Sequence, residues 1–321
     1  MTTDGGLQLK ADLLVLAISH PPPSLPAQAE AWRHHPALIA NPWQPGALDA
    51  IAPHARVAVM GTGLTMADTV ATLDRLGHRG SIVAFSRHGL LSRGNLSGAG
   101  ATWPGDYQQG SLRQIRLDVA YAAQQGLSWQ VVLDAVRQQG QRIWQALSVA
   151  DRQCFLRHYW DVHRYRVAPQ VAEVLEARQR TGSLQVQAAR LLSISGEGET
   201  LCLTLARRGG GVQTLSVDHL ILTTGPAHRA LTDSQPFLQD LARRGLIRAD
   251  ALGMGLEVDS RSRAVAEPHV EALPVLVAGP AACGRFGELM GLPQVADHAA
   301  DVAAQALLTL GIPQDSRCPA Y

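Results

Sequence analysis

The chain has 321 residues, enough for about two domains of roughly 100–200 residues each. Hydrophobic residues make up 46% of the sequence, so it can fill a sizeable core, and wholesale disorder is excluded. Charged residues make up only 17% and the net charge is +1, so electrostatics gives no reason to expect nucleic acid or a membrane surface as a partner. The best apolar run, residues 13–18, has the length of a strand, so no membrane span is expected.

The usage of reactive residue types excludes several chemistries. Lys10 is the only lysine among the 28 basic residues, and no Gly-Lys pair exists, which argues against a Schiff base and a phosphate-binding P-loop. His-Glu-x-x-His and Gly-x-Ser-x-Gly are both absent, and His34-His35 lacks a third ligand at useful spacing, so we expect no metal. The wide scatter of the cysteines favours reduced thiols and a cytoplasmic protein. These cysteines are Cys154, Cys202, Cys283 and Cys318.

The first hundred residues follow an α/β pattern. Their predicted elements are a buried strand at 12–18, a loop to about residue 54, a strand at 57–60, a helix from residue 64 to Gly77, and a strand at 81–85. Val70, Leu73 and Leu76 have the spacing of a buried helix face, and Gly77 is a typical helix end. The last three elements form a βαβ unit of about 30 residues, the usual size.

The remainder of the chain begins with a glycine-rich stretch. Residues 89–110 lack periodicity and are expected to form a mobile loop. The later elements are predicted as helices over 111–150, at 169–180 and from Pro293 to about residue 310, and as strands at 184–194, 201–207, 215–223 and 275–278.

A strand, Gly61-Thr62-Gly63 and a helix are typical of the phosphate half of a dinucleotide fold. Gly61 would allow the tight turn, and Gly63 would let a pyrophosphate approach the backbone at the positive end of the helix. The third glycine of the usual motif is Met66 here, which weakens the pattern. A plain strand–helix turn is the alternative interpretation.

The end of the next strand indicates which nucleotide is bound. NAD-binding proteins place an acidic residue here for the ribose diol, whereas this chain has Ser86-Arg87-His88 and no carboxylate until Asp106. Because a guanidinium matches a 2′-phosphate, NADP(H) is favoured over NAD. Alternatively, Arg87 is a solvated surface residue.

Residues 155–166 are dense in aromatic and basic side chains. Arg157, His158, His163, Arg164 and Arg166 could line an anionic site, and Tyr159, Trp160 and Tyr165 could stack on a flat ring. An amphipathic surface segment whose aromatic side chains fill a core gap would have the same composition.

Beyond the glycine turn, several segments resemble a known family. They are Ala40-Asn41-Pro42-Trp43, residues 57–68, Ser86-Arg87-His88-Gly89-Leu90-Leu91, Tyr159-Trp160-Asp161-Val162-His163-Arg164, Thr223-Thr224-Gly225-Pro226, and Ala278-Gly279-Pro280 with Pro293. Together they resemble the bacterial FAD/NAD(P)-binding oxidoreductases that are distantly related to flavin monooxygenases and to the ornithine and lysine N-hydroxylases. The resemblance spans nearly the whole chain, and Met66 is typical of it.

The resemblance implies an α/β fold with a Rossmann-like dinucleotide-binding domain, a helical insertion at about 111–180, and a partial second α/β domain of the FAD type. Residues 45–215 would form the NADP-binding domain, and residues 1–44 and 216–321 the remnant FAD-type domain. The cofactor-binding residues would be Gly61, Thr62, Gly63, Leu64, Thr65, Ser86, Arg87, Gly225, Gly279 and Pro280. In flavoproteins that bind two nucleotides, a strand end such as Gly279-Pro280 approaches the flavin.

One departure from the family concerns FAD. Family members begin with a glycine turn of their own for FAD, and residues 1–11 cannot supply one. A shortened sequence, a natural loss of flavin, and flavin contacts borrowed from a partner are the three explanations. The implied activity is hydride transfer from NADPH to FAD and then to oxygen or another acceptor, with a small-molecule substrate and, as a further option, a homo-oligomer.

Two other functions stay open at this point. A non-enzymatic NADP-binding or interaction protein would follow from the missing turn. A flavin-free NAD(P)-dependent dehydrogenase would need a proton-transfer pair such as Tyr/Lys, which the single lysine at position 10 disfavours.

Overall fold

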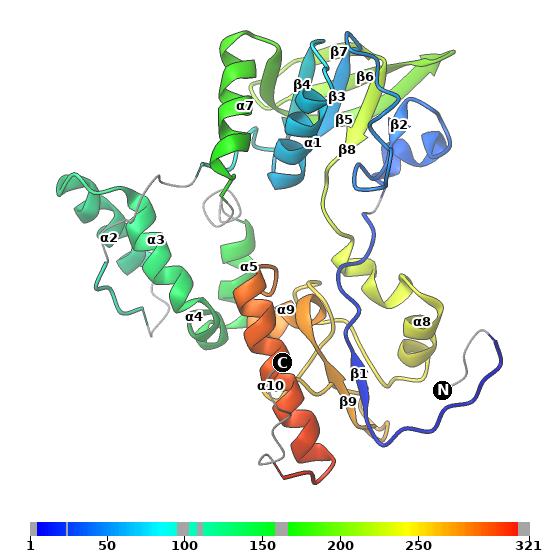
Figure 1. The fold of residues 1–321 in the computed structure, drawn as a ribbon, viewed down its shortest axis with the longest axis vertical. Coiled ribbons are helices and arrows are strands. Elements are labelled where there is room, and N and C mark those ends of the chain that lie inside the picture. The colour runs from blue at the N-terminus through cyan, green and yellow to red at the C-terminus, as the bar shows by residue number, and fades with distance from the viewer. Residues whose placement is uncertain (1–4, 24, 95–102, 108–111, 158–165, 314–321) are drawn as a thin grey trace.

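The computed structural model describes residues 5–23, 25–94, 103–107, 112–157 and 166–313, without the side chains of residues 112, 157 and 197. A large lobe is built on a seven-stranded sheet with the order β2-β8-β3-β4-β5-β6-β7 (Figure 1). The first five strands are parallel, and β5, β6 and β7 form an antiparallel meander at one edge. The strands are β2 (Leu38–Ile39), β3 (Val57–Met60), β4 (Ile82–Ser86), β5 (Leu184–Glu197), β6 (Thr200–Arg207), β7 (Val212–Val217) and β8 (His219–Leu222).

Both faces of this sheet are buried, as its apolar parallel strands require. Helices α1 (Leu64–Arg75) and α7 (Pro169–Arg180) cover one face, where Val57 and Val59 of β3 pack against Val70 and Leu73. On the other face Ala58 packs within a second core, which includes residues of the 3-10 helix η1 (Ala27–Trp32) and of β6. Alternate residues of one short strand therefore belong to two different cores.

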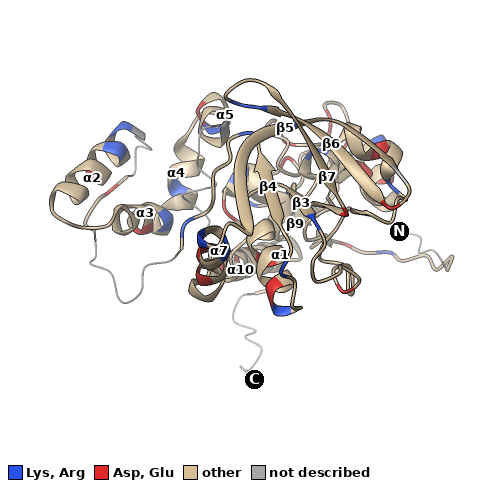
Figure 2. Ribbon diagram, turned by 90° about the horizontal axis from the view of Figure 1, so that it is seen from above, with Lys and Arg blue, Asp and Glu red and all other residues tan. Residues whose placement is uncertain are grey.

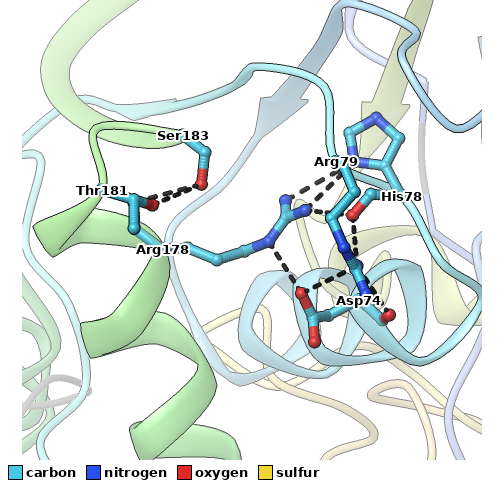
Figure 3. A network of polar contacts seen from close by, with 6 residues as sticks. All are labelled: Asp74, His78, Arg79, Arg178, Thr181 and Ser183. Carbon is cyan, nitrogen blue, oxygen red and sulfur yellow. Dashed lines mark hydrogen bonds and ion pairs between the residues drawn. The ribbon is translucent and has the colours of Figure 1, made fainter.

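A buried arginine ties the two covering helices together (Figure 3). The Arg178 side chain is 5% exposed, and its Nε lies 3.1 Å from the Asp74 carboxylate on α1. Its Nη2 donates to the carbonyl of His78, and the His78 ring in turn bonds the Ala55 carbonyl at 2.9 Å. The C-terminal ends of both helices are thus fixed to the loop before β3.

A small lobe lies below the first one in Figure 1. Its two-stranded parallel sheet joins β1 (Leu14–Leu16) to β9 (Val275–Val277), so the N-terminal and C-terminal regions of the chain meet there. Ile247, Leu256 and Val277 are among its buried core residues. The helices of this lobe are η2 (His228–Asp233), α8 (Pro236–Arg243), η3 (Gly279–Ala282), α9 (Cys283–Phe286) and α10 (Leu292–Thr309).

Four helices form a helical arm that stands to one side of the large sheet (Figures 1 and 2). They are α2 (Leu112–Gln124), α3 (Trp129–Gln138), α4 (Gly140–Ala146) and α5 (Val149–Arg157). The arm is anchored on the small lobe. The Trp144 indole N–H donates to the Gly284 carbonyl at 3.1 Å, and the buried Arg152 donates to that carbonyl at 3.2 Å and to the Trp144 carbonyl at 2.8 Å.

Two stretches of chain run side by side between the lobes. Residues 19–23 lead out of β1, and residues 223–228 lead from β8 towards η2. Pro23 and Pro226 form an isolated antiparallel bridge, and the Ala227 N–H donates to the Pro22 carbonyl at 3.1 Å. We call these two stretches the crossings.

The predicted fold class is confirmed: the molecule is α/β with a mainly parallel, Rossmann-type sheet and helices inserted after β4. Three details differ. The predicted strand 215–223 is two strands, because the chain changes partner at Asp218, from β6 before it to β3 and β2 after it. At this point the Asp218 carboxylate binds the Arg56 amide and guanidinium, both at 2.7 Å. Leu76 is 42% exposed, since α1 ends at Arg75. The sheet also extends beyond the predicted range 45–215, because it includes β2 and β8.

Candidate functional site

The turn after β3 is shaped by contact with β8. Gly61 has φ +123°, and a Cβ there would lie 2.4 Å from the Thr223 hydroxyl and 2.5 Å from its carbonyl oxygen. Both the amide and the hydroxyl of Thr223 donate to the Met60 carbonyl, at 2.9 and 3.1 Å. Only glycine therefore allows β3 and β8 to stay paired up to this turn.

Gly63 meets a different environment. It is the N-cap residue of α1, and a Cβ there would have nothing within 4 Å. The 12-residue helix α1 has no acidic residue in its first turn, so its unpaired N–H groups and positive dipole end face open space. Leu64 and Thr65 begin this helix. Met66, where the third glycine of the motif usually stands, is fully buried in the core between α1 and the sheet.

Thr62 and Ser86 use their hydroxyl groups on each other and on the chain nearby. Thr62 Oγ1 donates to the Leu90 carbonyl at 2.6 Å, so the 2.8 Å bond to Ser86 has Ser86 as its donor. Ser86 Oγ also accepts the Gly89 N–H at 3.0 Å. These bonds fix the segment that follows β4 and thereby place Arg87, while the backbone of Thr62 remains at the cleft.

Arg87 is exposed at the carboxyl end of β4. No ion pair joins it to an acidic side chain in the described part of the chain. Asp106, the first carboxylate after it in the sequence, lies 3.7 Å from Arg142 of the helical arm instead. The position that holds a ribose-binding carboxylate in NAD sites therefore presents a cation.

One cleft of about 1540 Å³ connects these residues to the small lobe. Its upper wall contains the glycine turn, the end of β4 and residues 190–192 of β5. The crossing that follows β8 contributes residues 223–226. Its other walls come from residues 250–254 and 287–288 of the small lobe and from Gln153 and Leu156 of the helical arm. The predicted residues that line it are Gly61, Thr62, Gly63, Leu64, Thr65, Ser86, Arg87 and Gly225.

Gly279 and Pro280, the other two predicted residues, are not among those that line this cleft. The Gly279 N–H donates to Nδ1 of His298 at 3.1 Å, and Nε2 of His298 lies 3.0 Å from the Ser262 hydroxyl. His298 is 1% exposed, and burial lowers its pKa, which matches a neutral ring with Nδ1 as acceptor. The Gly279 amide is therefore already engaged inside the small lobe.

Asp250 lines the cleft, and no motif in the sequence points to it. Its carboxylate accepts the Leu252 N–H at 2.7 Å and the Met254 N–H at 2.9 Å, and burial nevertheless raises its pKa. A side chain at Gly284 would collide with this carboxylate, at 2.5 Å. Asp250 therefore shapes the loop 250–254 that forms the lower wall of the cleft.

The basic and aromatic stretch gives little to the described site. Residues 158–165, which include His158, Tyr159, Trp160, His163, Arg164 and Tyr165, lie outside the described residues, as does the side chain of Arg157. Arg166 is described and is 10% exposed; it binds Asp134 at 2.9 Å and lies over the Trp129 ring. It therefore joins the arm to the chain before α7.

No group of three or more His, Cys, Asp or Glu side chains among the described residues could hold a metal ion. No helix in the described part of the chain is long and apolar enough to cross a membrane.

Comparison with known proteins gives matches among solved structures. No protein-family model matches the chain, and no curated protein sequence does. L-lysine 6-monooxygenase from Pseudomonas syringae superposes with a TM-score of 0.60 at 16% identity, over 93% of this chain and 64% of that one. Ornithine hydroxylase from Pseudomonas aeruginosa gives 0.60 at 14% identity, over 96% and 65%. Ornithine N-hydroxylase from Kutzneria sp. 744, with reduced FAD, NADP⁺ and L-ornithine, gives 0.56 at 16% identity, over 89% and 61%.

These likenesses establish a shared fold. The family resemblance drawn from the sequence is thus confirmed at the level of the fold, with the ornithine and lysine hydroxylases among the structural relatives. The chain spans less than two thirds of the length of each of these three structures.

Proposed function

We propose that this chain binds NADP(H) in the cleft and belongs to a flavin- and NAD(P)H-dependent oxidoreductase that acts on a small molecule. One observation carries the proposal. A single cleft joins the glycine turn and Arg87 of the large lobe to the wall that the small lobe provides. A dinucleotide held by its phosphates at the turn would extend its nicotinamide towards that second wall.

The residues at the turn fit NADP(H). The open space at Gly63 and the first N–H groups of α1 suit a pyrophosphate, and no carboxylate of that first turn repels it. Arg87 has no acidic partner among the described residues and would bind the 2′-phosphate with its guanidinium fork. Gly61 and the bonded pair Thr62–Ser86 would hold both elements in place.

For FAD the fit is partial. Cys283, Gly287 and Met290 of the small lobe line the cleft where a flavin ring would face the nicotinamide. Within the described residues, however, only the turn at 57–75 leads from a strand through glycine into a long helix. The strand β9 of the small lobe instead runs through Gly279 into the four-residue 3-10 helix η3. When bound, a flavin accepts a hydride from NADPH and passes electrons to oxygen or another acceptor. The pyrophosphate half of FAD finds no cradle among these residues.

The test starts with the purified chain. An absorbance spectrum reports bound flavin, and titration with NADPH and NADH gives the two dissociation constants. NADPH oxidation is then followed at 340 nm with and without added FAD. We expect NADPH to bind more tightly than NADH and to be oxidised once FAD is present. Failure to bind either nucleotide would overturn the proposal.

A non-enzymatic NADP(H)-binding protein is the second candidate. The single strand–glycine–helix turn of the described residues and the engaged Gly279 amide favour it. It predicts a colourless protein that binds NADPH tightly and oxidises none of it at any FAD concentration. The same titration and oxidation assay therefore separate the two candidates.

A further inference from the structure

A second arginine lies on β5, the strand next to the one that Arg87 follows. Arg190 of β5 is exposed and lines the same cleft. No ion pair joins Arg190 to an acidic side chain among the residues that the structure describes. The sequence has no Asp or Glu at 86–94, 184–196 or 200–212, so the charged side chains of these three stretches are all basic.

The strand register places the two arginines close to each other in the sheet. In the parallel pairing of β4 and β5, the last pair is Ser86 with Ala188. Arg87 follows directly after this pair on one strand, and Arg190 comes two residues after it on the other. Because side chains alternate along a strand, Arg190 shares the face of Ala188 and projects where β5 continues past its neighbour.

Arg208, in the turn between β6 and β7, adds positive charge near the end of β4. The Arg208 N–H donates to the Ala188 carbonyl at 2.9 Å, and Arg208 Nη1 lies 3.1 Å from Nδ1 of His88. His88 follows Arg87 and also lines the cleft. These contacts hold the segment 87–88 against β5, and both Arg87 and Arg190 line the cleft at this point.

Two guanidinium groups that have no carboxylate partner in the described part of the chain suit a phosphate monoester. Each fork can donate two parallel N–H bonds to phosphate oxygens, and such charged bonds are about twice as strong as neutral ones. From the proposed NADP(H) function, on which this inference rests, we infer that Arg190 and Arg87 together bind the 2′-phosphate. Arg190 is thus a second residue that determines preference for NADP(H) over NAD(H).

The experiment compares ligands that differ in the 2′-phosphate. Calorimetric titration of the full chain with NADP⁺, NAD⁺ and adenosine 2′,5′-bisphosphate is performed on wild type, Arg190→Ala, Arg87→Ala and the double variant. Arg180→Ala is the matched control, since Arg180 is an exposed arginine on α7 outside the cleft. Circular dichroism and thermal unfolding verify the fold, and Arg190→Gln replaces Arg190→Ala if the latter is unfolded.

We expect Arg190→Ala to weaken NADP⁺ and adenosine 2′,5′-bisphosphate by about tenfold or more, with NAD⁺ changed by less than about twofold. Because both arginines would hold one phosphate, the loss of NADP⁺ binding free energy in the double variant should differ from the sum of the losses in the two single variants. Arg180→Ala should match wild type.

Two results would overturn the inference while leaving the proposed function intact. In one, Arg190→Ala binds NADP⁺ as the control does. In the other, it loses NADP⁺ and NAD⁺ equally, which would make Arg190 a general contact. A wild-type chain that binds neither dinucleotide would instead reject the proposed function and this inference together.

Discussion

Gly61 and Gly63 stand two residues apart in one turn, yet the space around them differs. Gly61 is enclosed by Thr223 of the neighbouring strand, whereas Gly63 opens on the cleft. The first glycine is therefore required by the fold, and the second leaves room for a ligand. The sequence motif predicts the same division, with Gly61 for the tight turn and Gly63 for the approach of a pyrophosphate.

Substitution at the two glycines should separate stability from binding. Gly61→Ala forces a Cβ into backbone and should lower the free energy of unfolding by roughly 1–3 kcal/mol or more through overpacking and strain. Gly63→Asp supplies a favourable N-cap side chain at an extended backbone position, so stability should be kept. Its charge should repel the pyrophosphate and weaken NADPH by at least about tenfold. Urea unfolding measures the change in stability, and NADPH titration measures the change in binding. Unchanged NADPH binding by Gly63→Asp would show that the phosphates do not bind at this turn.

The site could be predicted from the sequence only where local pattern determines it. The glycine turn and Arg87 follow from strand, glycine and helix in a fixed order. Arg190 could not be found this way, because its position depends on the pairing of β4 with β5 across an insertion of about 100 residues. Asp250 could not be found from the sequence either, because its place in the cleft depends on contacts between distant parts of the chain. Gly279 was selected for its place after a strand, but the buried ring of His298 takes its amide.

At the scale of elements, one cluster anchors the helical arm on the small lobe. Trp144 packs against Gly287, whose added Cβ would lie 2.9 Å from the ring, and its indole shares the Gly284 carbonyl with Arg152. An ion pair of 3.2 Å between Arg137 and Glu288 lies on the same side. The arm is thus joined to the small lobe beside the cleft wall at residues 287–288.

Trp144→Ala should release this anchor. The loss of a large buried side chain costs about 3–5 kcal/mol, which here falls on the contact between the arm and the small lobe. Hydrogen exchange should accelerate in α4, α5 and residues 283–287 and stay unchanged in β3 and β4. Trp43→Ala is the control, since Trp43 is 63% exposed. Uniform acceleration over the whole chain would contradict a local anchor.

The network of Figure 3 gives an element-scale prediction for the large lobe. Arg178→Met keeps the volume but leaves the His78 carbonyl without its buried donor and Asp74 without its nearest cation on α7. Because Asp74 is 35% exposed, we expect a loss of about 1–3 kcal/mol in urea unfolding, less than for a fully buried pair. Arg180→Met, two residues further on the exposed side, should change stability by less than about 0.5 kcal/mol. Equal losses for both variants would contradict the network.

Elements with a clear local signal were predicted well. The helix 169–180 agrees with α7 to the residue, and the closing helix differs from α10 by one residue at each end. The strand predicted at 215–223 was wrong in its continuity, since the break at Asp218 is a change of partner from β6 to β3 and β2, which are distant in sequence. β2 was not predicted, because its two residues carry no periodicity.

At the scale of the whole molecule, the two crossings carry a pair of histidines. The rings of His20 and His228 meet edge to face at 5.3 Å, and the Nδ1 atoms of both are buried with no hydrogen-bond partner among the described residues. Burial, with a smaller contribution from His20, lowers the pKa of His228 to about 4, and burial also lowers the pKa of His20. Protonation would place charge in the connection between the lobes.

Stability should therefore depend on pH in a defined window. The unfolded chain takes up a proton on His228 near pH 6.5, whereas the folded chain does so near pH 4, so the free energy of unfolding rises with pH between these values. The urea midpoint should be lower at pH 5 than at pH 7.5. His228→Gln should reduce this difference, and His34→Gln, at an exposed position, should not. An unchanged slope in His228→Gln would assign the pH dependence to other groups.

The pairing of β1 with β9 has a consequence for biosynthesis. β1 is synthesised before every strand of the large sheet, and its partner β9 after all of them. Leu14 and Leu16 therefore wait without their partner strand while the large sheet is made, and the small lobe cannot close until β9 has emerged. The pairing that joins the two ends of this lobe is thus a late step in folding, because it spans the greatest separation along the chain of any strand pair described.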